Sequence, residues 1–362
     1  MTAPRLDILN INFYDWAGER LYRGGAERYV QDLAGLARGI GLVPRILQNA
    51  WKPFTASVDG IEVVGVPAAK QIDFHALSAG FAPHVEGAAL VIASPLELAC
   101  ALPAGAPVIG ISHGIWWDDP TGQLADPDRE RRRLHEALAR VTACVCVDTN
   151  FINWVRTRGD PAQPKLEYVP NCVALDRFPA QAKSFAGPLR VLFPRRLCAE
   201  RGFPGVLEAF DYLLPRHPDL EFHLCGGGAE REEVLAREFV ARHRDRARWT
   251  DLPMDEMPSA YAASHVVLLP TEYGEGTSLA CIEAMATNNA VVATHVGGLP
   301  NLVLDGYNGL LIKPGPQALV DAVERLVADR ALTARLAAHA LDVAGSFGLA
   351  RWQQRWLDLM GR

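Results

Sequence analysis

Two carboxylates flank the start of a predicted helix in the segment EGTSLACIEAMA, residues 275–286. Glu275 lies in a turn between two glycines, and Glu283 lies inside the apolar helix after seven intervening residues. The preceding segment, 264–270, is a short apolar run typical of a buried strand. Ligands of open α/β sheets bind beyond the carboxyl ends of the strands, so these acids can accept hydrogen bonds from ligand hydroxyl groups. Alternatively, Glu275 only complements the helix dipole and Glu283 is a solvated acid.

The same helix start can donate hydrogen bonds to an anion. Gly276 permits a tight turn, and Thr277 and Ser278 offer hydroxyl and backbone N–H groups at the predicted helix N-terminus. Helix N-termini attract phosphate because unpaired N–H groups point outward there. This combination favours a ligand that carries both hydroxyl and phosphate groups, such as a sugar nucleotide.

Further loops after predicted strands suit a phosphate-linked ligand. One contains Arg195, Arg196 and Arg201, and arginine binds phosphate bidentately while remaining charged. Two others contain Gly226–Gly228 and a glycine pair at 297–298, which let a backbone approach closely. Each loop alone is a weak signal, but their joint occurrence after strands of one predicted sheet favours a binding site.

The composition is that of a globular protein, with 49% hydrophobic and 22% charged residues among 362. A net charge of -6 argues against general nucleic-acid binding. The seven cysteines form no CxxC pair and fit a reducing compartment. No signal peptide or membrane-spanning run is apparent, so we expect a cytoplasmic protein.

Short apolar runs alternate with helical patterns along the chain, which predicts βαβ units and parallel sheets. The predicted strands are 5–12, 43–50, 61–66, 89–94, 107–112, 143–148, 189–194, 220–226, 265–270, 290–295 and 309–313. We therefore expect an α/β protein with two doubly wound, Rossmann-like domains, over 1–182 and 183–345. The joint is expected within 178–190, which is rich in Ala, Pro and Gly. Residues 346–362 predict an aromatic amphipathic helix that either docks on its own domain or crosses back to the first.

The segment 275–286, together with VVATHVGGLPNLVLDGYNGLLIKP at 291–314, resembles the donor site of the retaining GT-B glycosyltransferases of family 4. RGGAERYVQDLAGLARGIG at 23–41 and VPNCVALDRF at 169–178 extend the resemblance over nearly the whole chain. It implies an active site in the cleft between two domains. The implied reaction moves a hexose-type sugar from a nucleoside diphosphate to a saccharide, lipid-linked or other hydroxyl acceptor, in surface polysaccharide or glycoconjugate synthesis. It requires neither a metal nor another cofactor.

The resemblance also implies residue roles. Glu283 would bind the nucleotide ribose, Glu275 would contact the transferred sugar, and the backbone of 276–278 would meet the diphosphate. Arg196 and Arg201 would neutralise the diphosphate, although the family has a lysine where this chain has Arg201. Gly226 would line the donor site.

Two segments depart from the family pattern. Asn171-Cys172 stands in place of Asn-Gly, and the sequence NNA at 288–290 replaces Gly-x-Pro. Both changes remove backbone-permissive residues from loops, and neither alters the carboxylates.

In the first domain the resemblance places Gly24 and Gly25 over the diphosphate and His113 against the donor sugar, as a catalytic residue beside Glu275. The alternative for His113 is a structural histidine at a strand end.

Candidates for the acceptor-binding site are chosen by the chemistry that binds sugars. Trp116, Trp117 and Asp118 are acceptor-site candidates, because aromatic rings stack on sugars and carboxylates accept hydroxyl protons. For the aromatic residues, packing under a loop is the competing interpretation.

One interpretation of the basic segment RERRRLHEALAR, 129–140, is a peripheral contact with the inner face of the membrane. Its interspersed acids favour a solvated, salt-bridged helix face. Three other classes compete with a transferase: a nucleotide-sugar epimerase of GT-B-like fold, a non-catalytic sugar-binding protein, and a dinucleotide oxidoreductase. The last is disfavoured because the early loop YRGGAER lacks the GxGxxG pattern.

Overall fold

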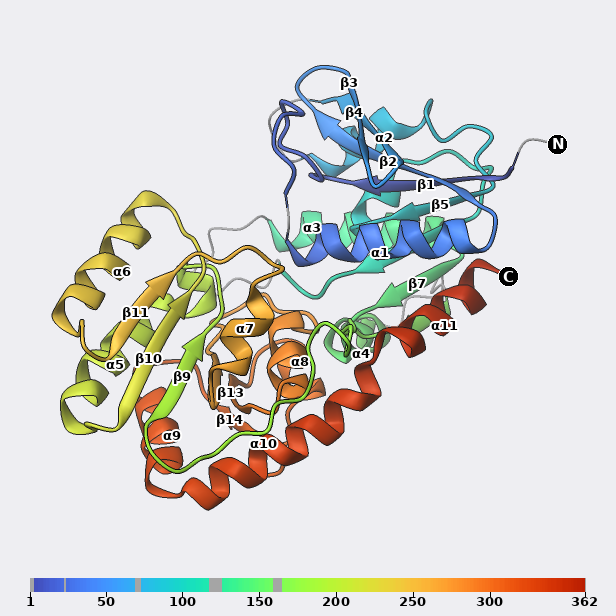
Figure 1. Ribbon diagram of the computed structural model, residues 1–362. Helices are drawn as coiled ribbons and strands as arrows, with labels where there is room; N and C mark the ends of the chain where they lie inside the picture. Colours follow the sequence, from blue (N-terminus) through green and yellow to red (C-terminus); the bar gives the residue numbers. More distant parts are fainter. Residues whose placement is uncertain (1–2, 23, 69–72, 117–125, 159–164, 362) are drawn as a thin grey trace. The chain divides into compact units, whose positions relative to one another are not determined.

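The computed structural model describes residues 3–22, 24–68, 73–116, 126–158 and 165–361. The chain folds into two compact units (Figure 1). Unit 1 comprises Met1–Pro170 and Trp352–Arg362, and unit 2 comprises Asn171–Arg351. Each unit is built on its own parallel sheet, which confirms the predicted fold class.

Unit 1 has an eight-stranded sheet in the order β3-β4-β2-β1-β5-β6-β7-β8, parallel except for the β3–β4 pair. Its strands are β1 (Arg5–Asn10), β2 (Val43–Ala50), β3 (Phe54–Val58), β4 (Ile61–Pro67), β5 (Leu90–Ala93), β6 (Val108–Ser112), β7 (Ala143–Cys146) and β8 (Lys165–Tyr168). The inner strands β5 and β6 are buried along their whole length because helices cover both faces of the sheet.

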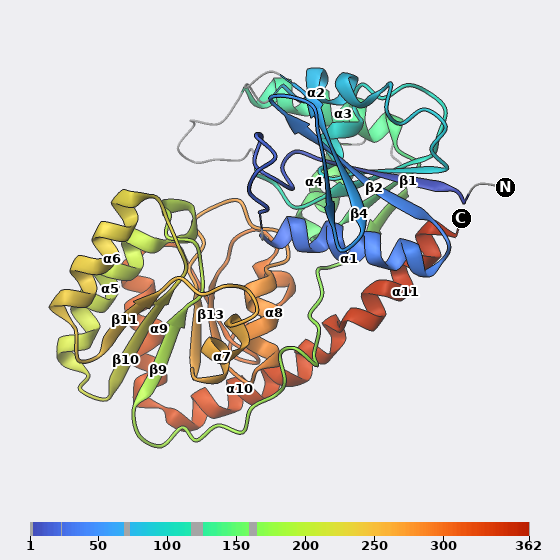
Figure 2. The ribbon, with the colours of Figure 1, turned by 45° about the horizontal axis from the view of Figure 1, so that its top comes forward.

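The helices of unit 1 are divided between the two faces of the sheet (Figure 2). α1 (Gly25–Gly39) covers one face with an apolar stripe that includes Tyr29, Val30 and Leu33. The other face packs against α2 (Phe74–Phe81), the 3-10 helix η1 (Leu96–Ala99), α3 (Pro127–Arg140) and α4 (Thr149–Arg158).

Unit 2 has a six-stranded, fully parallel sheet in the order β11-β10-β9-β12-β13-β14. Its strands are β9 (Leu189–Phe193), β10 (Leu220–Cys225), β11 (Ala247–Thr250), β12 (Val266–Leu269), β13 (Ala290–Thr294) and β14 (Leu310–Ile312). One face packs against α5 (Phe203–Arg216), α6 (Glu230–Arg242) and α9 (Pro316–Ala328). The other packs against α7 (Met257–Ala262), α8 (Leu279–Ala286) and part of α10 (Arg330–Ala344).

The strand order of unit 2 fixes where a ligand can bind. The chain passes from β9 outward to β10 and β11, then returns to place β12 on the other side of β9. The connections after β9 and β12 therefore leave in opposite directions and open a crevice at the carboxyl ends of these strands. Unit 1 has the equivalent switch point between β1 and β5.

Every strand predicted from the sequence is present, and β3, β8 and β11 are additional strands at sheet edges. The two units meet in sequence at Pro170 and Asn171, whereas composition predicted a joint within 178–190. The chain after Pro170 already bonds to unit 2, since the Val173 amide donates to the Phe347 carbonyl (2.9 Å) and Lys183 Nζ donates to the Tyr261 carbonyl (3.0 Å).

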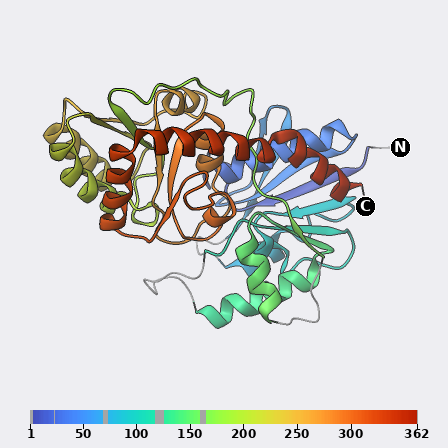
Figure 3. The same ribbon diagram turned by 90° about the horizontal axis from the view of Figure 1, so that it is seen from below.

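The chain ends in two successive helices, α10 and α11 (Leu349–Met360), shown in Figure 3. Residues of α11 from Trp352 onward belong to unit 1. Trp352 packs edge-on against Tyr29, and Trp356 Nε1 donates a hydrogen bond to the Tyr29 hydroxyl (2.8 Å). Within the described ranges, no helix has the length and apolarity to cross a bilayer.

Candidate functional site

Glu275 lies at the switch point of unit 2, in the turn between β12 and α8. Gly274, with a φ of 67°, lets the chain turn sharply before Glu275. The carboxylate is buried, with 9% of the residue exposed. A buried charge requires partners, so its neighbours determine what this site can do.

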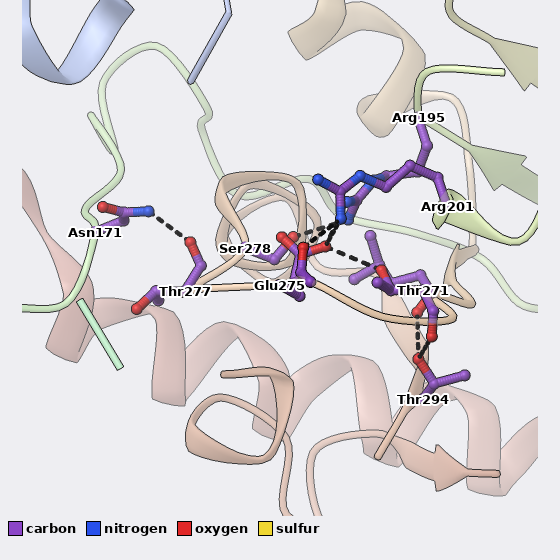
Figure 4. Close-up of polar contacts among 10 residues, drawn as sticks. Asn171, Arg195, Arg201, Thr271, Glu275, Thr277, Ser278 and Thr294 are labelled. Atoms are coloured by element: carbon purple, nitrogen blue, oxygen red, sulfur yellow. Dashed lines mark hydrogen bonds and ion pairs between the residues drawn. The ribbon is translucent and has the colours of Figure 1, made fainter. Parts of the chain in front are cut away.

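Two arginines and a threonine surround the Glu275 carboxylate (Figure 4). Arg195 Nη2 and Arg201 Nη1 both form ion pairs with Oε2, the latter at 3.0 Å. The Thr271 hydroxyl donates to the same oxygen at 2.9 Å. Both arginines follow β9, so the adjacent strands β9 and β12 bring these groups together.

The environment keeps Glu275 ionised. Burial alone would raise the pKa of Glu275, but the attraction of Arg195 and Arg201 outweighs it and holds the pKa below its usual value. Hydrogen bonds from Arg195 and Thr271 act in the same direction. Two guanidinium groups against one carboxylate leave the cluster with an excess positive charge that suits an anionic ligand.

The structure distributes the loop arginines differently from the sequence prediction. Arg195, to which the sequence assigned no separate role, turns inward to Glu275, and its Nη1 also donates to Ser278 Oγ at 3.0 Å. Arg196 is exposed and makes no hydrogen bond or ion pair with a side chain that the structure describes. Arg201, predicted to neutralise the diphosphate, lies beside Glu275 and also donates to the Gly274 carbonyl (3.0 Å).

Three glycines allow the loops to close around this cluster. A Cβ on Gly297 would lie 2.0 Å from the Glu275 carbonyl oxygen, and one on Gly226 would lie 2.3 Å from the Arg195 carbonyl oxygen. At Gly202 the corresponding distance to the Pro270 carbonyl oxygen is 2.0 Å. All three have positive φ, so both space and backbone conformation require glycine.

The start of α8 carries the predicted donors. Ser278 is the N-cap residue, yet its side chain makes no capping hydrogen bond and accepts one from Arg195 instead. The Thr277 carbonyl accepts a hydrogen bond from Asn171 Nδ2 at 2.5 Å (Figure 4). Gly276 is half-buried beside them. Asn171 therefore fixes the loop although Cys172 stands in place of the expected glycine.

Glu283 lies further along α8, and 6% of it is exposed. The Tyr261 hydroxyl donates to its Oε2 at 3.0 Å. The solvated-acid alternative is therefore wrong. The single charged residue of α8, Glu283, would normally mark a face of the helix that is exposed to solvent. In the structure this face is buried as well.

In unit 1, His113 follows β6 and its Nε2 lies 2.8 Å from the Ser94 hydroxyl. Tyr29 contacts the imidazole edge-on, with ring centroids 5.6 Å apart. Burial lowers the pKa of His113 to about 4, so the ring is neutral near pH 7. It can donate or accept one hydrogen bond to a ligand hydroxyl, but it carries no charge.

The other predicted residues of unit 1 are placed as follows. Gly24 is the N-cap of α1 and Gly25 its first residue. Trp116 Nε1 donates to the buried Glu97 at 3.0 Å, and its ring contacts Phe74. Trp117 and Asp118 lie outside the described residues.

The basic segment forms α3, whose arginines are not all solvated. Glu130 and Arg133 are both buried and form an ion pair with each other, whereas Arg129, Arg131 and Arg132 are exposed. The helix is salt-bridged as predicted, but this one pair is buried and not solvated.

Across the part of the chain that the structure describes, no group of three His, Cys, Asp or Glu side chains is arranged to hold a metal ion.

The region around the Glu275 cluster is similar in sequence to known glycosyltransferases. Residues 176–342 match the family model of glycosyl transferases group 1. D-inositol 3-phosphate glycosyltransferase of Corynebacterium diphtheriae is 35% identical over 179 residues, 47% of this chain and 41% of that protein. Alpha-D-kanosaminyltransferase of Streptomyces kanamyceticus is 32% identical over 41% of this chain and 39% of that protein. The matches thus span less than half of these relatives.

Solved structures resemble the whole chain. Sucrose-phosphate synthase of Thermosynechococcus elongatus gives a TM-score of 0.80 over 98% of both chains at 18% identity. HepE of Anabaena, solved in complex with UDP, gives a TM-score of 0.76 over 99% of both chains at 19% identity. At such identities the likeness establishes the fold alone, which is of the GT-B type with two Rossmann-like domains.

Proposed function

We propose that this chain is a glycosyltransferase that moves a hexose-type sugar from a nucleoside diphosphate to a hydroxyl acceptor with retention of configuration. The observation that carries the proposal is the Arg195–Glu275–Arg201 cluster at the switch point of unit 2. It lies within the region that matches the group 1 family model. HepE, a protein of similar fold, was solved with UDP bound.

The proposed donor site combines a positive cluster with buried carboxylates. Arg196, which is exposed, and Arg201 contact the diphosphate, and Ser278 and the backbone of 276–278 add neutral donors. Glu275 accepts a hydrogen bond from a sugar hydroxyl, and Glu283 from the ribose. Reaching Glu283 requires the ligand to share or displace the Tyr261 hydroxyl.

In the proposed reaction the bond between the anomeric carbon and the phosphate oxygen breaks, and a bond from the acceptor oxygen forms on the same face. The acceptor proton passes to the departing phosphate oxygen. Charge develops on the leaving diphosphate, and preorganised arginines lower the barrier by stabilising it. Neutral His113 supplies a hydrogen bond to the transferred sugar, and no metal is required.

The remaining assignments rest on the resemblance. A saccharide or lipid-linked acceptor and a role in surface polysaccharide or glycoconjugate synthesis fit the proposed chemistry, as does a cytoplasmic location. Trp116 stays an acceptor-site candidate because its ring is only half-buried, although its N–H is bonded to Glu97.

A transfer assay tests the proposal. The chain is incubated with UDP-, GDP-, ADP- and dTDP-sugars, with and without a panel of saccharide acceptors, and nucleoside diphosphate release is measured. We expect release that depends on an acceptor and falls about a hundredfold or more in Glu275→Gln, since a lost electrostatic contact to the transition state costs several kcal/mol. Acceptor-independent conversion to an isomeric sugar nucleotide would instead identify an epimerase.

A further inference from the structure

A cavity lies in unit 2, away from the Glu275 cluster. Its volume is about 300 Å³, at the small end of the range for ligand pockets. It is lined by the amino-terminal parts of β9, β10 and β11, the loop before β11 and the residues that follow α7. The Glu275 cluster lies at the carboxyl ends of the strands, so the two sites are at opposite ends of the sheet.

The cavity is basic although the chain as a whole carries a net charge of -6. Its lining contains four arginines and two carboxylates: Arg190, Arg244, Arg246, Arg248, Glu221 and Asp245. Such a surplus of guanidinium groups favours a phosphate, which arginine recognises with paired hydrogen bonds.

The arginines differ in what they already bind. Arg190 Nε donates to the Ala263 carbonyl and Arg246 Nη1 to the His217 carbonyl (2.9 Å), so both side chains are fixed in place. Arg248 is exposed, and its side chain makes no hydrogen bond or ion pair with any residue that the structure describes. It is therefore the arginine most available to a ligand.

His223 gives a second, independent observation that points to a ligand at this cavity. Only 7% of it is exposed, and its Nδ1 is buried without a hydrogen-bond partner in the described chain. Its Nε2 lies 2.7 Å from the Thr250 hydroxyl. Burial, reinforced by Arg248, lowers the pKa of His223 to about 4, so the ring is neutral near pH 7. When Thr250 donates to Nε2, Nδ1 carries the proton and can donate to an anion.

We propose that this cavity binds a phosphate monoester whose alcohol part carries hydroxyl groups. Arg248 pairs with the phosphate, and His223 Nδ1 donates the hydrogen bond that it otherwise lacks. Because β10 and β11 are adjacent and parallel, with His223 opposite Arg248, the two side chains project from the same face of the sheet. Glu221 accepts from the hydroxyl groups, since no ion pair occupies it within the described chain.

Isothermal titration calorimetry with glucose 6-phosphate, inorganic phosphate and unphosphorylated glucose tests the site. We expect the first two to bind and glucose not to bind. Arg248→Ala should weaken binding about tenfold or more, because hydrogen bonds to charged groups contribute roughly 1.5–3 kcal/mol. Arg325→Ala is the matched control, since Arg325 is an exposed arginine of α9 outside the cavity, and it should leave binding unchanged.

Two further arms separate the sources of the phosphate. Phosphatidylcholine vesicles with and without phosphatidic acid test a lipid headgroup: binding that needs phosphatidic acid and is lost in Arg248→Ala supports the same phosphate site with a lipid as its source. Arg196→Ala tests the proposed donor site and should leave binding of glucose 6-phosphate unaltered. The proposal is overturned if neither soluble nor lipid phosphate binds, if Arg248→Ala binds like the wild type, or if only Arg196→Ala weakens binding.

Discussion

The two units carry different groups at the carboxyl ends of their parallel strands: a charged cluster in unit 2 and a neutral pair in unit 1. In unit 2 the Glu275 carboxylate is buried between two guanidinium groups at the β9–β12 switch point. In unit 1 the residues after β5 and β6 are Ser94 and neutral His113, joined by one hydrogen bond. The fold is shared, so the difference lies in the residues grafted onto it.

Charge explains why the two regions are built differently. A buried carboxylate is stable only when cations and hydrogen bonds compensate it, so the loops of unit 2 close tightly and depend on glycine. A neutral imidazole needs only a hydroxyl and an aromatic wall, which Ser94 and Tyr29 supply. Unit 2 is therefore suited to a charged ligand, and unit 1 to hydroxyl groups.

The largest effect is expected from Gly297→Ala, which would disrupt the loop that carries Glu275. The new Cβ would lie 2.0 Å from the Glu275 carbonyl oxygen, which the fixed backbone cannot accommodate. We expect a loss of several kcal/mol in the free energy of unfolding, or failure to fold. Chemical denaturation measures this loss.

Gly306→Ala is the matched control for Gly297→Ala. Gly306 also has positive φ, 73°, but its Cβ would meet nothing within 4 Å. It should therefore cost only the conformational strain, about 1–2 kcal/mol. Equal losses in the two variants would show that the loop does not need the close approach.

The next effect separates the adjacent arginines. Arg195→Ala removes an ion pair from buried Glu275 and should lower the free energy of unfolding by about 3 kcal/mol. Arg196→Ala, at an exposed side chain, should change it by less than about 0.5 kcal/mol while weakening nucleoside diphosphate binding about tenfold or more. Chemical denaturation measures the stability of both variants, and calorimetry measures their affinity for nucleoside diphosphate. If Arg196→Ala were the destabilised variant and Arg195→Ala only the weaker binder, the two roles would be exchanged.

The smallest effect concerns the neutral region. Trp356→Phe removes the hydrogen bond to the Tyr29 hydroxyl, and Tyr29 forms the aromatic wall of His113. We expect a loss of about 2 kcal/mol in unfolding free energy, because the smaller ring leaves a void at a fully buried position and the hydrogen bond is lost. A double-mutant cycle with Tyr29→Phe isolates the pair, and a coupling energy near zero would mean that α11 does not support Tyr29 through this bond.

The sequence predicted the inner strands because burial on both faces makes several of them continuous apolar runs, as in β12 and β13. The edge strands β3, β8 and β11 were missed because they lack this burial. They are short or half-polar, and their burial patterns mix exposed and partly buried positions. Strand pairing, which sequence periodicity does not record, makes them strands.

Within the site, residue types were predictable and side-chain directions were not. Glu275 and Arg201 were identified from the loops that carry them, and the structure places them in contact. Which of Arg195 and Arg196 turns inward depends on the backbone direction after β9, and adjacent residues in an extended segment point oppositely. The Tyr261–Glu283 hydrogen bond joins α7 to α8 and has no local sequence signal.

The central claim is that unit 2 binds a nucleoside diphosphate at the Glu275 cluster without a metal. Calorimetric titration of the whole chain with UDP, GDP, ADP and dTDP, in buffer containing EDTA, tests it most directly. We predict that one diphosphate binds in EDTA, raises the free energy of unfolding by about 2.7 kcal/mol at a hundredfold excess over its Kd, and binds more weakly to Arg196→Ala. Absence of binding by all four, or binding that appears only when a divalent metal is restored, would contradict the account.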